Sequence, residues 1–381
     1  MAEREIGVGV IGFGLGGRVF HAPFVNAVSG LRLAAIMQRT GDEAAKAYPA
    51  TKIARSVEDL LADKSIELVV VSTPNQTHFA LAKQALEAGK HVVIDKPFAS
   101  TSEEAKQLGE LAKSKSLLVI PFHNRRWDGD FLTVKKLLAE QAVGRLVTFE
   151  SHFDRFRPVP RENTWKEAEN PANGMLFDLG PHLVDQVLAL FGAPSAITAS
   201  VRADRDQTAI EDAFDITLHY PAGHDSSGNA GSPTSGLGSL GPKGLLAHCR
   251  TSYLACDNAP RFLLHGTRGS FRKHGLDPQE PALVGGARVP TQGSQEVWLQ
   301  EDQSAWGTLT VAPNPADPAT LVTRQVKTER CDYRGFYANV RDAILGADPL
   351  AVTPEDGFRV IRLLELARES SAQARTLKVE F

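Results

Sequence analysis

Short apolar runs alternate with amphipathic stretches over the first 123 residues. The stretches Thr77–Lys90 and Ser102–Lys115 carry apolar residues at helical spacing, and the second opens with Ser and acidic residues, as capped helices do. Runs rich in Val and Ile, typical of strands covered on both faces of a parallel sheet, lie at Ile6–Ile11, Leu31–Met37, Glu67–Ser72, His91–Ile94 and Leu117–Phe122. This alternation predicts a doubly wound α/β domain with a parallel sheet over residues 1–123.

The pattern changes after residue 123. Helices are expected at Phe131–Glu140, at about Asp178–Phe191 and at about Pro354–Ala374. Strands follow one another without intervening helices, at Val147–Phe153, Ile197–Ala203, Phe214–Tyr220, Leu246–Tyr253 and Arg261–Leu264. Consecutive strands favour an antiparallel sheet, and we expect an α+β domain over residues 124–381 with an open, mainly antiparallel sheet. Within it, the Gly/Ser/Pro-rich residues 222–243 predict a flexible insert.

Composition narrows the class of protein. The 381 residues suit two or three domains at about 150 residues each. Lys and Arg number 42 against 45 Asp and Glu, a net charge of −3, which argues against nucleic-acid binding and a polybasic membrane patch. The three cysteines are too few and too scattered for a disulfide framework, and no paired-Cys or HExxH spacing predicts a metal site. The N-terminal residues carry charges of both signs and no long apolar stretch is present, so a cytoplasmic location is expected.

A glycine-rich motif, Gly12-Phe13-Gly14-Leu15-Gly16-Gly17, directly follows the first expected strand. In this position Gly12 permits a tight turn, Gly14 lets the backbone approach a pyrophosphate, and Gly17 allows close helix–strand packing. The next helix then directs its N-terminal N–H groups toward the phosphates. An ordinary glycine-rich loop is the alternative interpretation. We expect Gly12, Phe13, Gly14, Leu15 and Gly17 to bind a dinucleotide.

The end of the second expected strand bears on the choice of dinucleotide. NAD-binding proteins usually place Asp or Glu there to hold the ribose 2′-hydroxyl, whereas this chain has Gln38-Arg39-Thr40. Arg39 can pair with a 2′-phosphate and Thr40 can donate a hydrogen bond to it. The sequence therefore favours NADP(H), with NAD(H) possible, and a solvated loop arginine is the alternative reading of Arg39.

Two further segments carry candidate chemistry. Asp95-Lys96-Pro97 closes the strand His91–Ile94, and ligands of open α/β sheets bind outside the carboxyl ends of the strands. The Pro can adopt cis geometry and sharpen the turn. Farther along, Asp178, His182 and Asp185 share one helical face if a helix begins at Asp178. If the helix begins later in the sequence, this argument is weaker. Pro181 requires the helix to begin close to Asp178. Each element alone is more often structural than catalytic.

Taken together, these motifs resemble the Gfo/Idh/MocA oxidoreductases. The resemblance spans both expected domains and rests on GFGLGG at Gly12–Gly17, STPNQTH at Ser72–His78, DKP at Asp95–Pro97 and DLGPHLVD at Asp178–Asp185. The family more often has Glu before the Lys-Pro pair, so Asp95 departs from its pattern. GFGLGGRVFHAPF, FHNRRWDGDF and KHGLDPQE are most similar to the branch that contains NADP-dependent scyllo-inositol dehydrogenases. The insert is not explained by the resemblance.

The resemblance implies an N-terminal Rossmann dinucleotide-binding domain and roles for individual residues. Lys96 would contact the cofactor, polarise the reacting oxygen and position the substrate. His182 would act as general acid/base, and Asp178 would bind substrate or tune His182. Thr73, Pro74, Asn75 and His78 would line the nicotinamide side of the cofactor. A hydroxyl-rich substrate also needs polar partners, for which the candidates are Asn124, Arg125, Asp154, Arg157 and Trp165.

The function expected from these observations is reversible oxidation of a secondary alcohol in a sugar, inositol or polyol. The α+β domain of the family often forms a subunit interface through its sheet, and a homo-oligomer is expected. One alternative is an oxidoreductase of the same fold that couples two sugars through a tightly bound cofactor. Another is a non-catalytic nucleotide-sensing regulator, against which the presence of Lys96, Asp178 and His182 argues.

Overall fold

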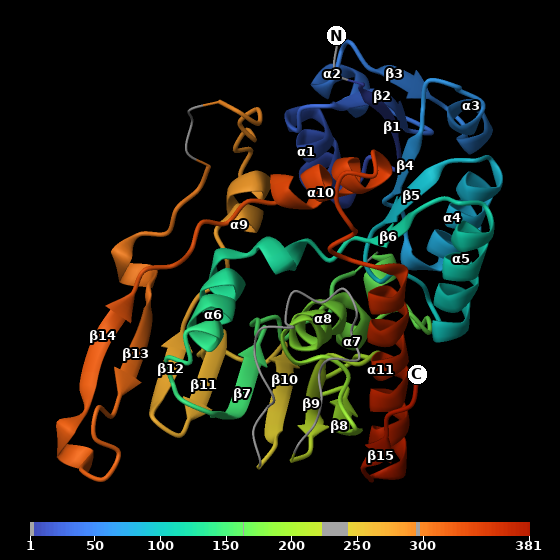
Figure 1. Cartoon of the computed structure of the whole chain (residues 1–381). Coiled ribbons are helices and arrows are strands. Elements are labelled where there is room, and N and C mark those ends of the chain that lie inside the picture. The colour runs from blue at the N-terminus through green and yellow to red at the C-terminus, as the bar shows by residue number, and fades with distance from the viewer. Residues whose placement is uncertain (1–3, 163, 223–242, 295–297) are drawn as a thin grey trace. The chain divides into compact units, whose positions relative to one another are not determined.

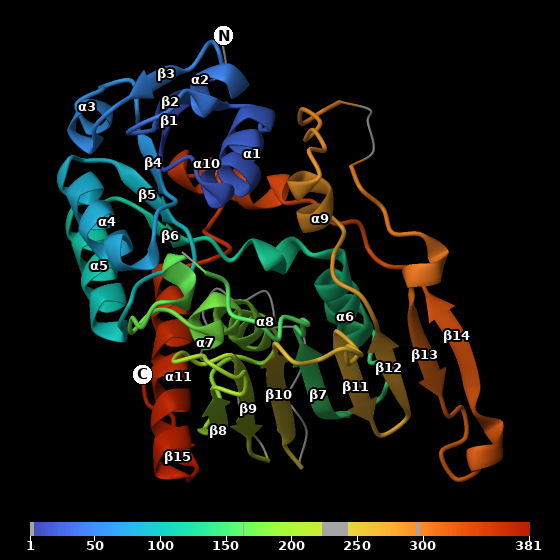
Figure 2. The ribbon, with the colours of Figure 1, turned by 180° about the vertical axis from the view of Figure 1, so that it is seen from behind.

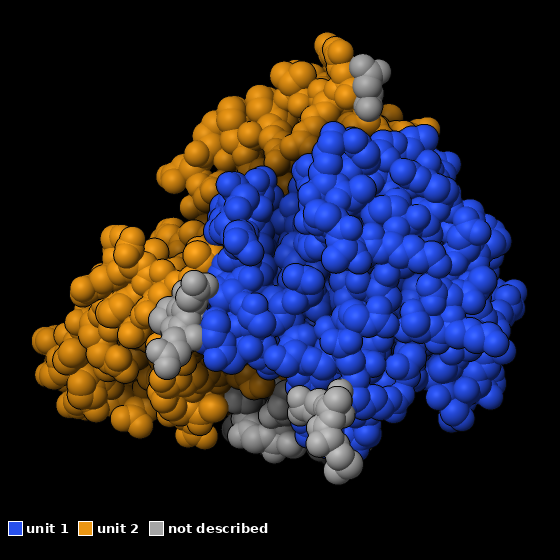
Figure 3. Space-filling model, turned by 90° about the horizontal axis from the view of Figure 1, so that it is seen from above, with its two compact units in different colours: residues 1–124, 279–298, 332–361 blue, residues 125–278, 299–331, 362–381 orange. Residues whose placement is uncertain are grey.

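The computed structural model describes residues 4–162, 164–222, 243–294 and 298–381 (Figure 1). The chain divides into two compact units. The first contains residues 1–124, 279–298 and 332–361, and the second contains residues 125–278, 299–331 and 362–381 (Figure 3). Two late segments therefore belong to the unit built around the N-terminal sheet. Residues 223–242, which make up most of the expected flexible insert, lie outside the described residues.

A parallel sheet forms the centre of the first unit, in the order β3-β2-β1-β4-β5-β6. Every residue of β1 and β4 is buried, as their continuous apolar sequences require. The strand order reverses between β1 and β4, which is where open α/β sheets bind ligands. The described strands are β1 (Ile6–Ile11), β2 (Leu31–Met37), β3 (Lys52–Ala54), β4 (Leu68–Val71), β5 (His91–Ile94) and β6 (Val119–Pro121). The expected doubly wound sheet is confirmed.

Helices connect these strands. They are α1 (Ala22–Ala27), α2 (Glu43–Ala47), α3 (Val57–Leu61), α4 (His78–Glu87) and α5 (Ser102–Ser114), and the later segments add α9 (Gln279–Val284) and α10 (Arg334–Ile344). The glycine-rich turn leads into a π-helical turn, Gly16–His21, before α1 begins. Pro23 has no N–H to continue the preceding hydrogen-bond ladder, which is consistent with a new helix starting there. Helix α10 packs against α1.

A mixed sheet dominates the second unit, in the order β14-β13-β12-β11-β7-β10-β9-β8-β15 (Figure 2). All neighbouring pairs are antiparallel except β7 with β10. The described strands are β7 (Leu146–His152), β8 (Ala196–Arg202), β9 (Ala213–Tyr220), β10 (Leu245–Ser252), β11 (Phe262–Gly266), β12 (Gly269–Lys273), β13 (Gly307–Val311), β14 (Val322–Val326) and β15 (Leu377–Lys378). The mainly antiparallel α+β architecture is confirmed.

Helices cover one face of this sheet. Helices α6 (Gly129–Ala139), α7 (Met175–Asp178) and α8 (Gly180–Phe191) belong to the second unit, and α11 (Pro354–Gln373) has residues in both units. Helix α8 packs against the sheet through Phe191, whose ring lies 5.3 Å from that of Phe149. Along β9 and β10 buried residues alternate with less buried ones, the period expected of a half-covered sheet. None of the helices in the described part of the chain combines the length and the apolar character that a membrane span requires.

Candidate active site and cofactor-binding site

The glycine-rich turn follows β1 and has the shape of a dinucleotide cradle. Gly12 has φ +101°, and a Cβ there would overlap the carbonyl oxygen of Ser72. A Cβ on Gly17 would overlap the carbonyl oxygen of Gly12, whereas a Cβ on Gly14 would meet nothing within 4 Å. Gly12 and Gly17 are thus required by the turn itself, and Gly14 leaves a face of the backbone open. The turn fits a pyrophosphate.

The side chains of Phe13 and Leu15 flank the open position. Phe13 makes an edge contact with Tyr48, at 6.2 Å between ring centroids. Leu15 is 53% exposed. Both residues are therefore placed where a dinucleotide could cover them.

The loop after β2 carries the residues expected to choose the dinucleotide. The Gln38 side chain accepts a hydrogen bond from the backbone N–H of Ala44 (2.9 Å). Arg55, which the sequence analysis did not single out, donates to the carbonyl oxygens of Gln38 (2.9 Å) and Gly41 (2.8 Å). Arg39 and Thr40 are exposed. Arg55 thus holds the backbone of the loop in place, while the side chains of Arg39 and Thr40 face solvent.

The loop after β4 contains the second set of predicted cofactor residues. The Thr73 and Thr77 hydroxyls lie 2.6 Å apart, and Thr77 also donates to the carbonyl oxygen of Pro74 (2.7 Å). Asn75 begins a 3-10 turn, Asn75–Thr77, that leads into α4. This turn places residues 73–75 at the carboxyl edge of the sheet.

His78 lies beneath this loop. The residue is buried, with Nδ1 2.8 Å from the carbonyl oxygen of Pro97 and Nε2 2.9 Å from that of Thr73. Burial lowers the pKa of His78, although the charge of Asp95 acts in the opposite direction. The ring joins the loops that follow β4 and β5, and direct contact with the cofactor stays a prediction for this residue.

Lys96 directly follows β5, and the Lys96–Pro97 peptide bond is cis. Strands β1, β4 and β5 are parallel, so their carboxyl ends meet at one edge of the sheet. Lys96 is therefore at the same edge as the glycine-rich turn. Both belong to the first unit.

Asp178 and His182 belong to the second unit. The helix that carries His182 and Asp185 begins after Asp178, which weakens the argument that all three residues share one helical face. Asp178 ends the short helix α7, and Leu179 separates it from α8, which begins at Gly180 with Pro181 in its first turn. Proline is tolerated there because its missing N–H has no intrahelical acceptor. His182 and Asp185 remain one turn apart on α8, and both are buried.

A buried polar network that the sequence analysis missed holds α8. Arg126 donates from Nε and Nη2 to the two carboxylate oxygens of Asp185, at 2.9 and 2.6 Å. Gln186 donates to the carbonyl oxygen of Arg125 (2.8 Å) and accepts from Arg261 (2.6 Å). The helix turn that carries His182 is therefore tied to the segment before α6. The sequence indicated this network only through Asp185, three residues after His182. The partner of Asp185, Arg126, lies 59 residues away in sequence, so the spacing could not reveal the pair.

The predicted substrate residues fall in several environments. Asn124 is buried at the end of the first stretch of unit 1, whereas the other candidates belong to unit 2. Arg125 is buried and lies 3.2 Å from Asp128. Asp154 accepts a hydrogen bond from the backbone of Ser252 (3.1 Å). The guanidinium of Arg157 lies 5.7 Å from the Tyr253 ring centroid. Polar groups are present, but their assignment to substrate stays a prediction.

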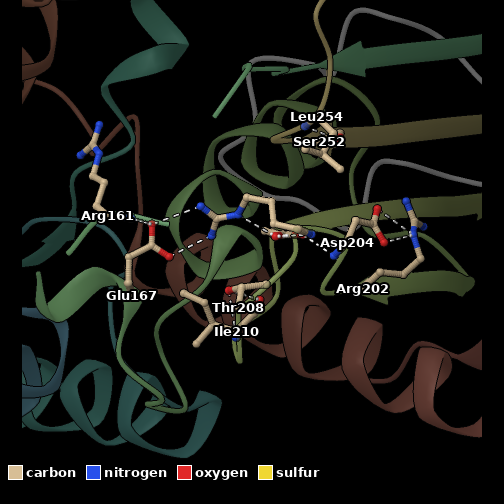
Figure 4. A network of polar contacts seen from close by, with 10 residues as sticks. Arg161, Glu167, Arg202, Asp204, Thr208, Ile210, Ser252 and Leu254 are labelled. Carbon is tan, nitrogen blue, oxygen red and sulfur yellow. Dashed lines mark hydrogen bonds and ion pairs between the residues drawn. The ribbon is translucent and has the colours of Figure 1, made fainter. Parts of the chain in front are cut away.

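Trp165, the remaining candidate, is 39% exposed on the turn Trp165–Glu167. Figure 4 shows Glu167 facing a guanidinium, and Arg205 donates to its carboxylate at 2.8 Å. Arg205 also pairs with Asp212 at 2.8 Å. The neighbouring Lys166 Nζ lies 3.3 Å from a carboxylate oxygen of Asp178. This ion network anchors the turn and brings a cation to a predicted catalytic carboxylate.

Family models match nearly the whole chain. The model described as oxidoreductase family, NAD-binding Rossmann fold, matches residues 6–123. The GFO/IDH/MocA C-terminal domain matches residues 131–272, and the oxidoreductase family C-terminal alpha/beta domain matches residues 243–381. The N-terminal unit is therefore an NAD-binding Rossmann domain by family.

Individual relatives agree. The chain is 38% identical to the uncharacterized oxidoreductase YdgJ of Escherichia coli (strain K12), over 98% of each. It is 36% identical to the scyllo-inositol 2-dehydrogenase (NADP(+)) IolW of Bacillus subtilis (strain 168), over 98% of this chain and 96% of that protein. The solved structure of yvaA from Bacillus subtilis is 33% identical, has a TM-score of 0.88 and is covered over 100% of both chains. An oxidoreductase from Bacillus cereus has a TM-score of 0.82 at 31% identity, over 99% of both. The chain belongs to the Gfo/Idh/MocA family of oxidoreductases.

Proposed function

We propose that this oxidoreductase is an NADP(H)-dependent dehydrogenase acting on a secondary alcohol, or the matching carbonyl, of a sugar, inositol or related polyol. One observation carries the proposal. Lys96 lies at the same sheet edge as a glycine-rich turn whose Gly14 is open to a ligand. A cation beside the cofactor cradle is what a reacting oxygen next to nicotinamide requires.

The loop after β2 supports NADP(H) over NAD(H). Its exposed side chains include Arg39 and Thr40, close to the end of β2 where NAD-binding proteins usually place a carboxylate, so a 2′-phosphate would meet a cation and a hydroxyl there. Arg55 holds the backbone of this loop through two carbonyl oxygens. The relative IolW is named as an NADP(+) enzyme, which is in line with this choice.

The proposed chemistry assigns a role to Lys96, to His182 and to Asp178. The nicotinamide, when bound, supplies the hydride acceptor or donor. In the oxidation direction the Lys96 ammonium polarises the substrate hydroxyl, and neutral His182 takes its proton. Asp178 binds a substrate hydroxyl or orients His182. Lys166, 3.3 Å from Asp178, balances the charge of that carboxylate.

The substrate class follows from the polar side chains and the relative. We assign Asn124, Arg125, Asp154, Arg157 and Trp165 to substrate binding, because a polyol needs several hydrogen-bond partners and a flat apolar surface. IolW is named as a scyllo-inositol 2-dehydrogenase, and inositols are therefore the first compounds to test.

The direct experiment is a screen of inositols, sugars and aldehydes with NADP(H) and with NAD(H), followed by nicotinamide absorbance. Turnover of at least one cyclic polyol with NADP(H) is the expected result. Tight nucleotide binding without turnover of any compound would support the nucleotide-sensing alternative instead.

Location and assembly complete the proposal. We place the enzyme in the cytoplasm. By sequence we divide it into a dinucleotide-binding domain, residues 1–123, and a substrate-binding and oligomerisation domain, residues 124–381, of which residues 279–298 and 332–361 pack in the first compact unit. The sheet of the second unit is the proposed assembly surface, because an open, mainly antiparallel sheet has a face that a second copy of the chain would cover. Light scattering should show a homo-oligomer, and a monomer at micromolar concentration would contradict this part.

A further inference from the structure

The Asp95 carboxylate, one residue before Lys96, is the centre of a polar cluster inside the first unit. Its Oδ1 accepts a hydrogen bond from the Lys96 backbone N–H at 2.8 Å. Its Oδ2 accepts from the Ser72 hydroxyl at 3.1 Å and lies 3.3 Å from Nε2 of His21. A Cβ on Gly16 would lie 2.6 Å from the same oxygen. One carboxylate therefore joins the ends of β4 and β5 to the turn after β1.

His21 extends the cluster into the core. Its side chain is fully buried, and its ring lies 4.2 Å from the ring of Phe122. Nδ1 lies 2.7 Å from the hydroxyl of Tyr337, which is also fully buried, on α10. The sequence places Tyr337 316 residues from His21, and the fold brings them together within one unit.

The chemistry of the three groups sets the direction of the hydrogen bonds. Burial acts to raise the pKa of Asp95, but the nearby His21 ring and the charge of Lys96 act against it, and the net shift is downward. An ionised carboxylate can only accept, so the proton of a neutral His21 ring belongs on Nε2, which faces Asp95 Oδ2 at 3.3 Å in a close contact rather than a formed hydrogen bond. Burial and the nearby Asp95 raise the pKa of the Tyr337 phenol. The hydroxyl keeps its proton and donates it to Nδ1.

We propose that His21 and Tyr337 are positioning residues for Lys96, acting through the Asp95 carboxylate. Tyr337 fixes the His21 tautomer, His21 holds the Asp95 carboxylate, and that carboxylate holds the Lys96 backbone N–H. This inference rests on the proposed role of Lys96. Neither His21 nor Tyr337 touches substrate in it.

Two substitutions at His21 separate positioning from packing. Both remove the aromatic ring and its contact with Phe122. A glutamine amide reaches the place of Nε2 and keeps a donor for Asp95, whereas an asparagine amide reaches only the place of Nδ1. We expect His21→Gln to keep kcat within about threefold of wild type. His21→Asn should lower kcat by about tenfold or more, the scale seen when residues that orient metal ligands are changed.

Tyr337→Phe tests the tautomer step. Without the hydroxyl, the His21 proton can move to Nδ1, and kcat should fall several-fold. Adding His21→Gln should restore it, because an amide donor has no tautomer to lose. Tyr220→Phe is the matched control, since it deletes an equally buried hydroxyl that donates to the Gly192 carbonyl oxygen at 2.9 Å. It should lower the melting temperature without changing kcat.

A second readout needs no turnover. The rate at which acetic anhydride acetylates Lys96, followed by peptide mass spectrometry, should change at least about threefold in His21→Asn and stay near wild type in His21→Gln. Equal labelling and equal kcat in the two variants would overturn this inference and leave the proposed function intact. If wild type turns over no substrate, the proposed function fails, and the labelling rates still decide whether His21 positions Lys96.

Discussion

Replacing Asp185 with Asn should destabilise the second unit strongly. The carboxylate makes two hydrogen bonds to the Arg126 guanidinium, at 2.9 and 2.6 Å. The two side chains are 2% and 11% exposed, respectively. Water can therefore do little to replace the lost charge on Asp185. The substitution leaves the Arg126 guanidinium beside a neutral amide in the core.

The magnitude follows from this burial. Removing one partner of a buried ion pair costs about 3–5 kcal/mol. The amide oxygen of Asn keeps at most one of the two hydrogen bonds, so we expect about 3 kcal/mol, the lower end of that range. Because His182 lies one turn before Asp185 on α8, kcat should fall as well.

The assay is urea unfolding of the full chain, followed by tryptophan fluorescence and circular dichroism. Arg126→Met combined with Asp185→Leu should recover more than half of the loss, because it removes both buried charges together. Glu87→Gln serves as the control, since its partner Lys83 and Glu87 are both about half exposed, and it should cause no measurable change. If Asp185→Asn costs no more than Glu87→Gln, the buried pair does not hold α8.

Three further results are expected. Arg39→Asp should weaken NADP(H) binding by about 1.5–3 kcal/mol and spare NAD(H), as titration of cofactor fluorescence would show; equal affinities throughout contradict the NADP assignment. Gly14→Ala should fold normally but bind the dinucleotide less tightly, whereas Gly17→Ala should unfold at lower temperature, because its Cβ overlaps the Gly12 carbonyl oxygen. The folded-state pKa of His78 lies below the ordinary 6.5. As the pH falls, this histidine is therefore protonated in the unfolded chain before it is protonated in the folded chain. Unfolding free energy should then fall below about pH 6.5 by up to about 1.4 kcal/mol per pH unit for each such histidine; a flat profile from pH 7.5 to 5 contradicts this. Burial also lowers the pKa values of His91, His219 and His248, which therefore contribute to the same pH dependence.

The pattern of apolar residues predicted most of the strands of the parallel sheet. The buried runs of Val and Ile became β1, β2, β4 and β5 with bounds within a residue, because strands covered on both faces read as continuous apolar sequence. Strands β3, β12, β13, β14 and β15 were not expected from the sequence. In β14 all residues but the last are exposed, so the alternation that marks a half-buried strand is absent.

The site was predicted in part for the same reason. The glycine-rich turn could be predicted because the turn itself requires its glycines. Lys96 could be predicted because it directly follows an apolar strand. The contacts of His21 include Tyr337, and the polar network of α8 includes Arg126. Both partners lie far away in sequence, and such long-range pairs leave no periodic pattern in the sequence. The motif KHGLDPQE was noticed without a role. In the structure Lys273 pairs with Glu301 (3.0 Å), and Asp277 accepts from the Gly129 N–H (2.8 Å), so part of it supports the fold.

The central claim is that Lys96 and His182 act on the reacting oxygen and not on the dinucleotide. The most direct measurement compares NADP(H) affinity and turnover in Lys96→Ala, His182→Ala and wild type, with the best polyol from the screen. We expect NADP(H) affinity within a few-fold of wild type and turnover lower by about 10²–10⁴, the contribution typical of a general acid or base. Unchanged turnover in either variant, or loss of nucleotide binding in proportion to turnover, would contradict it.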